Sequence, residues 1–213
     1  MNYEQIISDL KSKKYASIYF LAGEETYYID LISNYIENHV LSDANKGFNQ
    51  SILYGRDVEV NALISSAKQF PMMSENTVII IKEAQELKKI EELTSYIQQP
   101  LSSTILVLCY RGKKLDKRKA LYKSLQKNGL YFESNKLYEN KIPGWIKKYL
   151  EERDYTIGFK SAAMLTEFLG NDLSKIAGEL NKLSILVEKG SEITAKLIEN
   201  NIGISKDYNN FEL

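Results

Sequence analysis

The sequence predicts an α/β protein in which helices cover both faces of a mostly parallel sheet. Short β-branched or aromatic runs alternate along the chain with longer amphipathic runs. Two of the short runs, Val78–Ile81 and Ile105–Leu108, are entirely apolar, as expected for strands that are covered on both faces. Alternation of this kind favours a doubly wound sheet.

The elements of this sheet follow one another between residues 18 and 132. The predicted strands are Ile18–Ala22, Gln50–Tyr54, Thr77–Ile81, Thr104–Cys109 and Leu130–Phe132. The helices predicted between them are Glu25–His39, Val58–Ala67, Glu86–Gln98 and Asp116–Lys127.

The pattern changes after residue 141, because strand-like runs no longer occur. Pro143 and Gly144 favour a junction, since proline disfavours helix in the residue before it and glycine keeps the turn free. The clearest set of apolar residues at helical spacing is Leu173, Ile176, Ala177, Leu180 and Leu183. Thr194 is a candidate N-cap for a last helix. The sequence therefore predicts an α/β domain at residues 1–141 and a small all-α domain at residues 142–213.

The composition is that of an ordinary globular protein and excludes several kinds of site. Lys and Arg together number 28, as do Asp and Glu, so no global charge marks the chain as a nucleic-acid or membrane binder. A single cysteine, Cys109, and a single histidine, His39, argue against disulfides, multi-Cys metal sites and His-based catalysis. We expect no metal, no cofactor and no catalytic residue. Without a signal-peptide pattern or a long apolar run, we expect a cytoplasmic protein.

A phosphate-binding loop is expected after the first strand of a nucleotide-binding α/β domain, but the residues for it are missing. Gly23 is followed by Glu24 and Glu25, which would repel a triphosphate, and no Gly-Lys-Ser or Gly-Lys-Thr occurs in the chain. Lys82 follows the third strand, where an acidic pair would hold Mg²⁺. The structural alternative for the two glutamates is the first turn of a helix, where the dipole stabilises acidic side chains.

Six segments follow one another over most of the chain. They are Tyr19–Tyr27, Phe70–Ile81, Lys114–Arg118, Ile142–Ile146, Gly170–Leu183 and Gly190–Thr194. No single segment is specific, but the ordered set resembles the delta subunit of the bacterial DNA polymerase III clamp loader. The resemblance implies an AAA+-like, P-loop-type sheet domain without a working P-loop, followed by a small helical lid domain. In the family a collar domain comes next, and the chain stops at Leu213, so we expect a two-domain piece without the collar.

The resemblance also implies a function. Delta subunits bind the ring-shaped sliding clamp and open or hold open one of its interfaces during loading on primed DNA, without hydrolysing ATP themselves. The implied partners are the clamp, the other clamp-loader subunits and primer–template DNA, and no membrane is implied. The protein would then be an accessory subunit of a DNA-directed DNA polymerase rather than an enzyme. We expect the isolated chain to be a monomer.

The family contacts the clamp with an apolar plug from the loop before the third strand. In this sequence that loop holds Phe70, Pro71, Met72 and Met73, and Pro71 stiffens it by fixing its φ angle. The alternative is that Phe70 lies under the sheet and the methionines fill gaps in the core. The resemblance favours Met72 and Met73 as the plug, and leaves open both the place of Phe70 and the identity of the main anchor.

A basic run follows the fourth strand and carries Lys113, Lys114, Lys117 and Arg118. One interpretation is contact with DNA phosphates, which would depend on salt and not on sequence. The other is a solvated, charged helix face with Asp116 as its N-cap.

Two further hypotheses belong to other functional classes. An active AAA+ ATPase is disfavoured by the missing lysine and glycines of a phosphate loop. A nucleic-acid-binding or adaptor α/β protein unrelated to replication stays open on the residues alone. A pull-down against the organism's own sliding clamp separates it from a clamp-loader subunit.

Overall fold

The computed structural model describes residues 2–202 of the chain. The chain divides into two compact units between Asn135 and Lys136, and each unit is described by itself. The second predicted domain starts at Ile142, where the first long helix of the second unit begins. The apolar end of the sequence, Asn209–Leu213, lies outside the described residues.

The first unit contains a five-stranded parallel sheet with the order β2-β3-β4-β1-β5. Its strands are β1 (Ile18–Gly23), β2 (Gln50–Tyr54), β3 (Thr77–Lys82), β4 (Thr104–Arg111) and β5 (Leu130–Ser134). All five strands were expected from the sequence, and their ends lie at or just beyond the predicted residues. The doubly wound α/β class is therefore confirmed for this unit.

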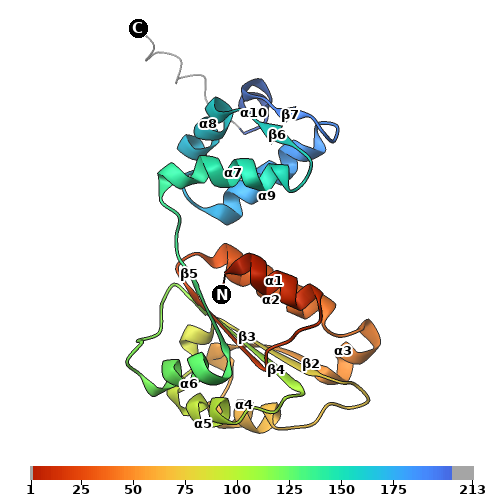
Figure 1. Cartoon of the computed structure of the whole chain (residues 1–213), viewed down its shortest axis with the longest axis vertical. Coiled ribbons are helices and arrows are strands. Elements are labelled where there is room, and N and C mark those ends of the chain that lie inside the picture. The colour runs from red at the N-terminus through yellow and green to blue at the C-terminus, as the bar shows by residue number, and fades with distance from the viewer. Residues whose placement is uncertain (1, 203–213) are drawn as a thin grey trace. The chain divides into compact units, whose positions relative to one another are not determined.

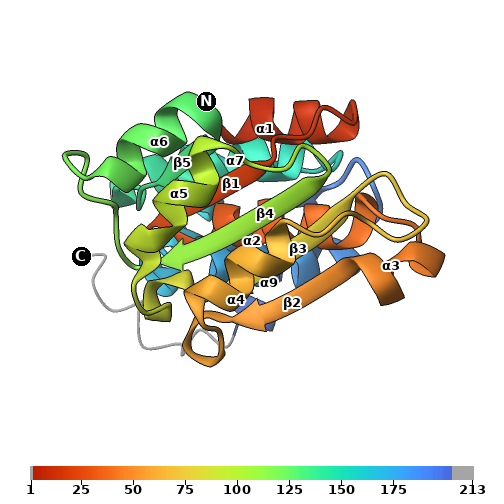
Figure 2. The same ribbon diagram turned by 90° about the horizontal axis from the view of Figure 1, so that it is seen from below.

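Helices cover both faces of this sheet (Figure 1). One face carries α1 (Tyr3–Lys11) and α2 (Thr26–His39), and the other carries α4 (Val60–Ala67), α5 (Thr94–Gln98) and α6 (Ala120–Asn128). Figure 2 shows the second group of helices in front of the strands. The short helix α3 (Asp43–Asn49) lies at one end of the sheet, directly before β2.

Strand β1 explains why the central strands read as continuous apolar runs. Ile18 and Phe20 belong to the core under α4, α5 and α6, whereas Tyr19 and Leu21 belong to the core under α1 and α2. Every residue of β1 is buried, because side chains alternate between two covered faces. Full burial of one large apolar side chain stabilises the fold by about 1.5–3 kcal/mol.

Two of the predicted helices of this unit differ in the structure. The expected helix Glu86–Gln98 is broken into two 3₁₀ turns, Ala84–Glu86 and Ile90–Leu93, and the short helix α5. Each 3₁₀ turn directly follows a residue in the left-handed conformation, Glu83 with φ 54° for the first turn and Lys89 with φ 56° for the second. Helix α6 begins at Ala120 rather than at Asp116, and its N-cap position is Lys119. The sequence also left α1 and α3 unpredicted.

The second unit, as far as residue 202, is built mainly from four helices. They are α7 (Ile142–Glu151), α8 (Phe159–Leu169), α9 (Leu173–Ile185) and α10 (Ala195–Asn201), with a 3₁₀ turn at Glu139–Lys141 before α7. The five apolar residues predicted on one face of α9 are all buried. Thr194 is the N-cap of α10, since its hydroxyl oxygen accepts a hydrogen bond from the Leu197 N–H at 3.3 Å.

One detail of the second unit contradicts the all-α expectation. Two short strands, β6 (Thr156–Ile157) and β7 (Glu192–Ile193), pair in parallel. Ile157 and Ile193 are buried, so the pairing closes part of the core. A run of two residues is too short to show a strand period, and the sequence therefore gave no sign of it. Within residues 2–202, no helix combines the length and apolar character that crossing a bilayer requires.

Candidate functional site

The carboxyl ends of β1, β4 and β5 meet at the place where open parallel α/β sheets usually bind ligands. Gly23 ends β1 with φ 135°, a conformation that L side chains rarely adopt. A Cβ atom at this position would lie 1.9 Å from the carbonyl oxygen of Ser134 on β5. Gly23 is thus required by the close approach of two strands, independently of any phosphate.

The turn after β1 is closed by the chain's own hydrogen bonds. The Gly112 N–H donates to the Gly23 carbonyl at 2.8 Å, and the Glu25 N–H donates to the Ser134 carbonyl at 3.2 Å. The carboxylate of Glu25, which is only 4% exposed, accepts from the Tyr27 N–H at 2.9 Å. Glu25 is therefore the N-cap of α2. The sequence had suggested a place one position later, in the first turn of the helix. Its carboxylate takes the place that an anion would take at a helix N-terminus.

Ion pairs fill the region beyond the ends of β3 and β4. Lys82 Nζ lies 3.1 Å from Glu37 Oε2, and Arg111 pairs with Asp30 of α2. Burial raises the pKa of the Asp30 carboxyl, although the neighbouring Arg111 opposes this rise. The residues that the structure describes contain no group of three or more Asp, Glu, His or Cys that could hold a metal ion.

Cys109 lies inside β4 and faces the same side of the sheet as α2. Burial raises the pKa of its thiol to about 11. Since the thiolate is the reactive form, the thiol is inert at neutral pH.

The opposite end of the sheet is open. The 68–76 loop joins α4 to β3, so it lies at the amino ends of the strands, next to α3 (Figure 2). Three of its large apolar side chains face solvent: Phe70 is 77% exposed, Met72 62% and Met73 100%. Pro71 is partly buried between them. The alternative in which Phe70 lies under the sheet and the methionines fill the core is therefore excluded.

Asn49, the last residue of α3, fixes the middle of this loop. Its Oδ1 accepts from the Met72 N–H at 2.7 Å, and its Nδ2 donates to the Met72 carbonyl at 2.9 Å. The same Nδ2 donates to the Asn45 carbonyl at 3.2 Å. Asn49 is 2% exposed. Sequence reasoning missed this residue, because a side chain that binds a backbone group far along the chain leaves no local pattern.

The described part of the first unit exposes large apolar residues on this loop, on α3 and along β2. Outside the loop they are Phe48, Ile52, Leu53 and Tyr54. Phe48 precedes Asn49 on α3, and the other three belong to β2, which is an edge strand of the sheet. Phe48 thus adds apolar surface beside Asn49, which contacts the loop, and exposed apolar surface of this kind is typical of protein-binding sites.

The basic run after β4 is largely paired with acids of the same unit. Lys114 and Lys117 both lie near Glu133, at 3.0 and 3.4 Å, and Arg118 lies 2.9 Å from Asp116. Hydrogen bonding from Lys114 lowers the pKa of Glu133, and hydrogen bonding from Arg118 lowers the pKa of Asp116 to about 2.

Lys113 is the one residue of the predicted basic set that forms no ion pair within residues 2–202. Asp116 does not cap α6; its carboxylate instead accepts hydrogen bonds from the backbone and side chain of Arg118.

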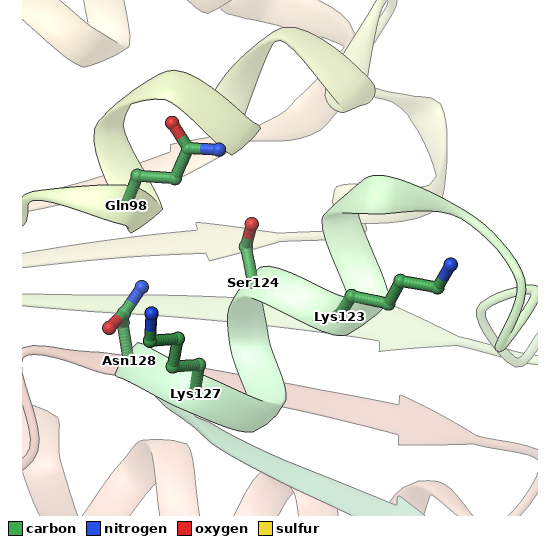
Figure 3. A pocket seen from close by; sticks show the side chains of 5 residues that line it. All are labelled: Gln98, Lys123, Ser124, Lys127 and Asn128. Atoms are coloured by element: carbon green, nitrogen blue, oxygen red, sulfur yellow. The ribbon is translucent and has the colours of Figure 1, made fainter.

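A polar hollow lies between the end of α5 and helix α6, and its α6 residues follow the basic run closely along the chain (Figure 3). It is lined by Gln98, Lys123, Ser124, Lys127 and Asn128. The two lysines come from successive turns of α6, and neither forms an ion pair with a described residue. The sequence did not single out this hollow, because its residues are those of any solvated helix face.

Comparison with known proteins gives consistent matches. A family model described as DNA polymerase III, delta subunit, matches residues 19–135. A curated relative, DNA polymerase III subunit delta of Bacillus subtilis strain 168, is 30% identical over 214 residues, which cover 96% of this chain and 62% of the relative. The chain thus spans less than two thirds of the length of that relative.

Solved structures agree with the α/β architecture. The Bacillus subtilis DNA clamp loader delta protein has a TM-score of 0.75 and 27% identity, over 93% of this chain and 62% of that one. The Thermotoga maritima RuvB Holliday junction branch migration motor has a TM-score of 0.50 and 14% identity, over 93% of this chain and 65% of that one. The RuvB match supports the fold alone. The AAA+-like fold class expected from the sequence is confirmed.

Proposed function

The chain belongs to the family of DNA polymerase III delta subunits, and on this premise we propose that it binds the sliding clamp through its 68–76 loop. As a clamp-loader subunit, it would open or hold open one interface of the ring for loading on primed DNA. The observation that carries the proposal is the full exposure of Met73, next to Met72 and Phe70, on a loop whose backbone is held by Asn49.

The energetics of such a contact are favourable. Burial of one methionine side chain in a partner's pocket supplies about 1.5–3 kcal/mol before ordering costs. The flexible thioether adapts to the shape of a pocket, which suits methionine to protein-binding surfaces. Because the backbone of Met72 is already held in the free chain, less conformational entropy is lost on binding.

The test is the double substitution Met72→Ala with Met73→Ala. We expect surface plasmon resonance to show at least about a hundredfold weaker binding to the cognate clamp, from about 3 kcal/mol of lost burial. Thermal unfolding should change little, because both side chains are exposed in the free chain. A matched control replaces another adjacent pair of exposed apolar residues, Ile185 and Leu186 of the second unit, by alanine. Unchanged clamp affinity in the Met72/Met73 variant would contradict the proposal.

We also propose that the subunit does not hydrolyse ATP. Support comes from the carboxylate of Glu25 at the N-terminus of α2 and from the ion pair of Lys82 with Glu37 beyond β3. An NTPase needs backbone amides and a lysine for the phosphates at the first place and an acid for Mg²⁺ at the second. Release of labelled phosphate from ATP by the purified chain would overturn this part.

Contact with primer–template DNA inside an assembled clamp loader is a further part of the proposal. Lys113 is the best placed of the predicted residues, because Lys114, Lys117 and Arg118 are already paired with Glu133 or Asp116. An electrophoretic shift that survives replacement of all four by alanine would remove these residues from the interface. An adaptor role outside replication predicts instead that the chain fails to retain the organism's clamp in a pull-down.

A further inference from the structure

We propose that Asn49 is a positioning residue for clamp binding, and that it holds the 68–76 loop in the conformation that presents Met72 and Met73. The inference rests on the proposed function, since it assigns the loop to the clamp contact. It adds a residue from a different element, α3, to the binding site. Met72, the loop residue to which Asn49 is hydrogen-bonded, is 23 positions further along the chain.

The carboxamide of Asn49 pairs with Met72 as a neighbouring strand would. It satisfies both backbone groups of that residue, with Oδ1 facing the N–H at 2.7 Å and Nδ2 facing the carbonyl at 2.9 Å. The third hydrogen bond, from Nδ2 to the Asn45 carbonyl, ties the side chain to its own helix. All the hydrogens of the amide group are thereby used, so the side chain has one orientation that satisfies its partners.

The part of the loop from residue 70 to residue 76 has no other polar support among the described residues. Within the described part of the chain, the only hydrogen bonds formed by residues 70–76 are the two between Met72 and Asn49. Met73, the next residue, has φ 52°, a left-handed conformation that residues other than glycine rarely adopt. A loop of exposed apolar residues with this strain is expected to sample other conformations once Asn49 is removed.

The chemistry of the side chain is specific. Aspartate has the same shape but no hydrogen to donate, so it would turn an oxygen towards the Met72 carbonyl. It would also bury a charge at a position that is almost inaccessible to solvent. Alanine removes all three hydrogen bonds and leaves the Met72 backbone without a partner. Both variants should therefore release the loop, although no atom of Asn49 needs to touch the clamp.

The experiment measures clamp affinity for the 213-residue chain and three variants: Asn49→Ala, the Met72→Ala/Met73→Ala pair, and the triple variant. We expect Asn49→Ala to weaken binding about tenfold to thirtyfold, the size of one or two lost hydrogen bonds. In the triple variant, Asn49→Ala should add less than about twofold, because there is no longer a plug to position. Asn181→Ala is the control; it removes an asparagine that accepts a hydrogen bond from Tyr149 in the second unit.

The outcomes separate this inference from the proposed function. If the methionine pair can be replaced without loss of affinity, the clamp assignment itself fails. If that pair matters but Asn49→Ala changes affinity less than about twofold, only the positioning role is wrong. An effect of Asn49→Ala that persists in full in the triple variant would also overturn it, since Asn49 would then act without the methionines.

A second measurement begins with the native chain, so its first result does not depend on how well a variant folds. In the native chain, hydrogen exchange should show protection of the Met72 amide, which donates to Asn49, and fast exchange of the neighbouring Met73 amide. Asn49→Asp should remove the protection at Met72 while leaving the amides of β1 protected. Fast exchange at Met72 in the native chain would contradict the inference.

Discussion

The two ends of the parallel sheet in the first unit differ in which side chains they expose to solvent. At the carboxyl end, Gly23 packs against Ser134, Glu25 caps α2, and Lys82 and Arg111 are paired with acids. At the amino end, the 68–76 loop exposes its largest apolar side chains. The end at which α/β sheets usually bind ligands is thus closed by the chain's own groups, and the end that usually lacks function is open.

This difference is consistent with the proposed use of a nucleotide-type architecture for binding another protein. Closure of the carboxyl end is expected to supply stability, because Glu25, Lys82 and Arg111 each have a partner within the unit there. The amino end keeps apolar surface and backbone strain, which are features of binding sites. Substitutions at the carboxyl end should therefore change unfolding, and substitutions at the amino end should change binding.

The largest effect is expected from Gly23→Ala at the closed end. The new Cβ would meet the Ser134 carbonyl oxygen at 1.9 Å, so β1 and β5 must separate. We expect a loss of more than about 4 kcal/mol in the free energy of unfolding, measured with urea. The matched control is Gly112→Ala, which also has a positive φ, 71°, but meets no atom within 4 Å. Its cost should be about 1–2 kcal/mol, and equal losses in both variants would contradict the packing explanation.

The second effect is a loss of stability at alkaline pH through Cys109. Its pKa is raised from 9.0 to about 11 in the folded chain, so the folded state holds its proton after the unfolded state has lost it. The contribution is complete below pH 9 and falls by about 1.4 kcal/mol per pH unit between pH 9 and pH 11.

Cys109→Ala tests this effect, because it removes the thiol and leaves every other titrating group in place. The difference between the unfolding free energies of the native chain and the variant should shrink as the pH rises from 9 to 11. A difference that stays constant over this range would mean that the thiol is less buried than the structure shows.

A smaller effect is expected from the N-cap of α2. Glu25→Ala removes the carboxylate that accepts from the Tyr27 N–H and should lower the unfolding free energy by about 1 kcal/mol. Glu24→Ala changes the preceding, exposed glutamate and should stay within about 0.5 kcal/mol of the native chain. Clamp affinity should be the same for both variants, since neither lies at the amino end. Weaker binding in either one would break the division between the two ends.

The smallest effect on stability is expected at the open end, from Met73→Gly. Glycine adopts φ 52° without strain but is freer in the unfolded chain, so the two terms nearly cancel. We expect a change of less than about 1 kcal/mol in unfolding and a clear loss of clamp affinity. Lys89→Gly is the control, because Lys89 is also exposed and has φ 56°. It should match the stability change without altering binding, and a similar loss of binding would contradict the assignment.

The central strands were predictable from the sequence because two covered faces favour apolar residues at nearly every position. Val78–Ile81 could not have been placed on a solvated surface, and the same holds for β4. The helix predicted at Glu86–Gln98 failed for a different reason. Leu87, Ile90 and Leu93 are all buried and follow a helical spacing, but the left-handed backbone at Lys89 breaks the helix. The spacing of apolar residues thus predicted correctly which side chains are buried, but it did not predict the backbone conformation. Short turns can bury the same side chains as a continuous helix.

The candidate site was predictable only in part. The sequence and its resemblance pointed to Met72 and Met73, and the structure shows that both side chains are free to meet a partner. The proposed role of Asn49 depends on contact between α3 and the 68–76 loop, which meet only after folding. No local sequence pattern therefore predicts it. For Lys114 and Arg118 the sequence predicted more than the structure bears out. They look like an unpaired basic patch in the sequence, but in the fold they form ion pairs with Glu133 and Asp116.

The strand order has a consequence for how the protein is made. The central strand β1 pairs only with β4 and β5, and the earlier of these begins at Thr104. Ribosomes add roughly 5–20 residues per second, so β1 waits for several seconds without a strand partner while the intervening chain is synthesised. During this time Ile18–Gly23, which is fully buried in the finished sheet, remains an unpaired apolar segment. The nascent chain therefore depends on early cover of β1 by α1 and α2 until translation has passed β4.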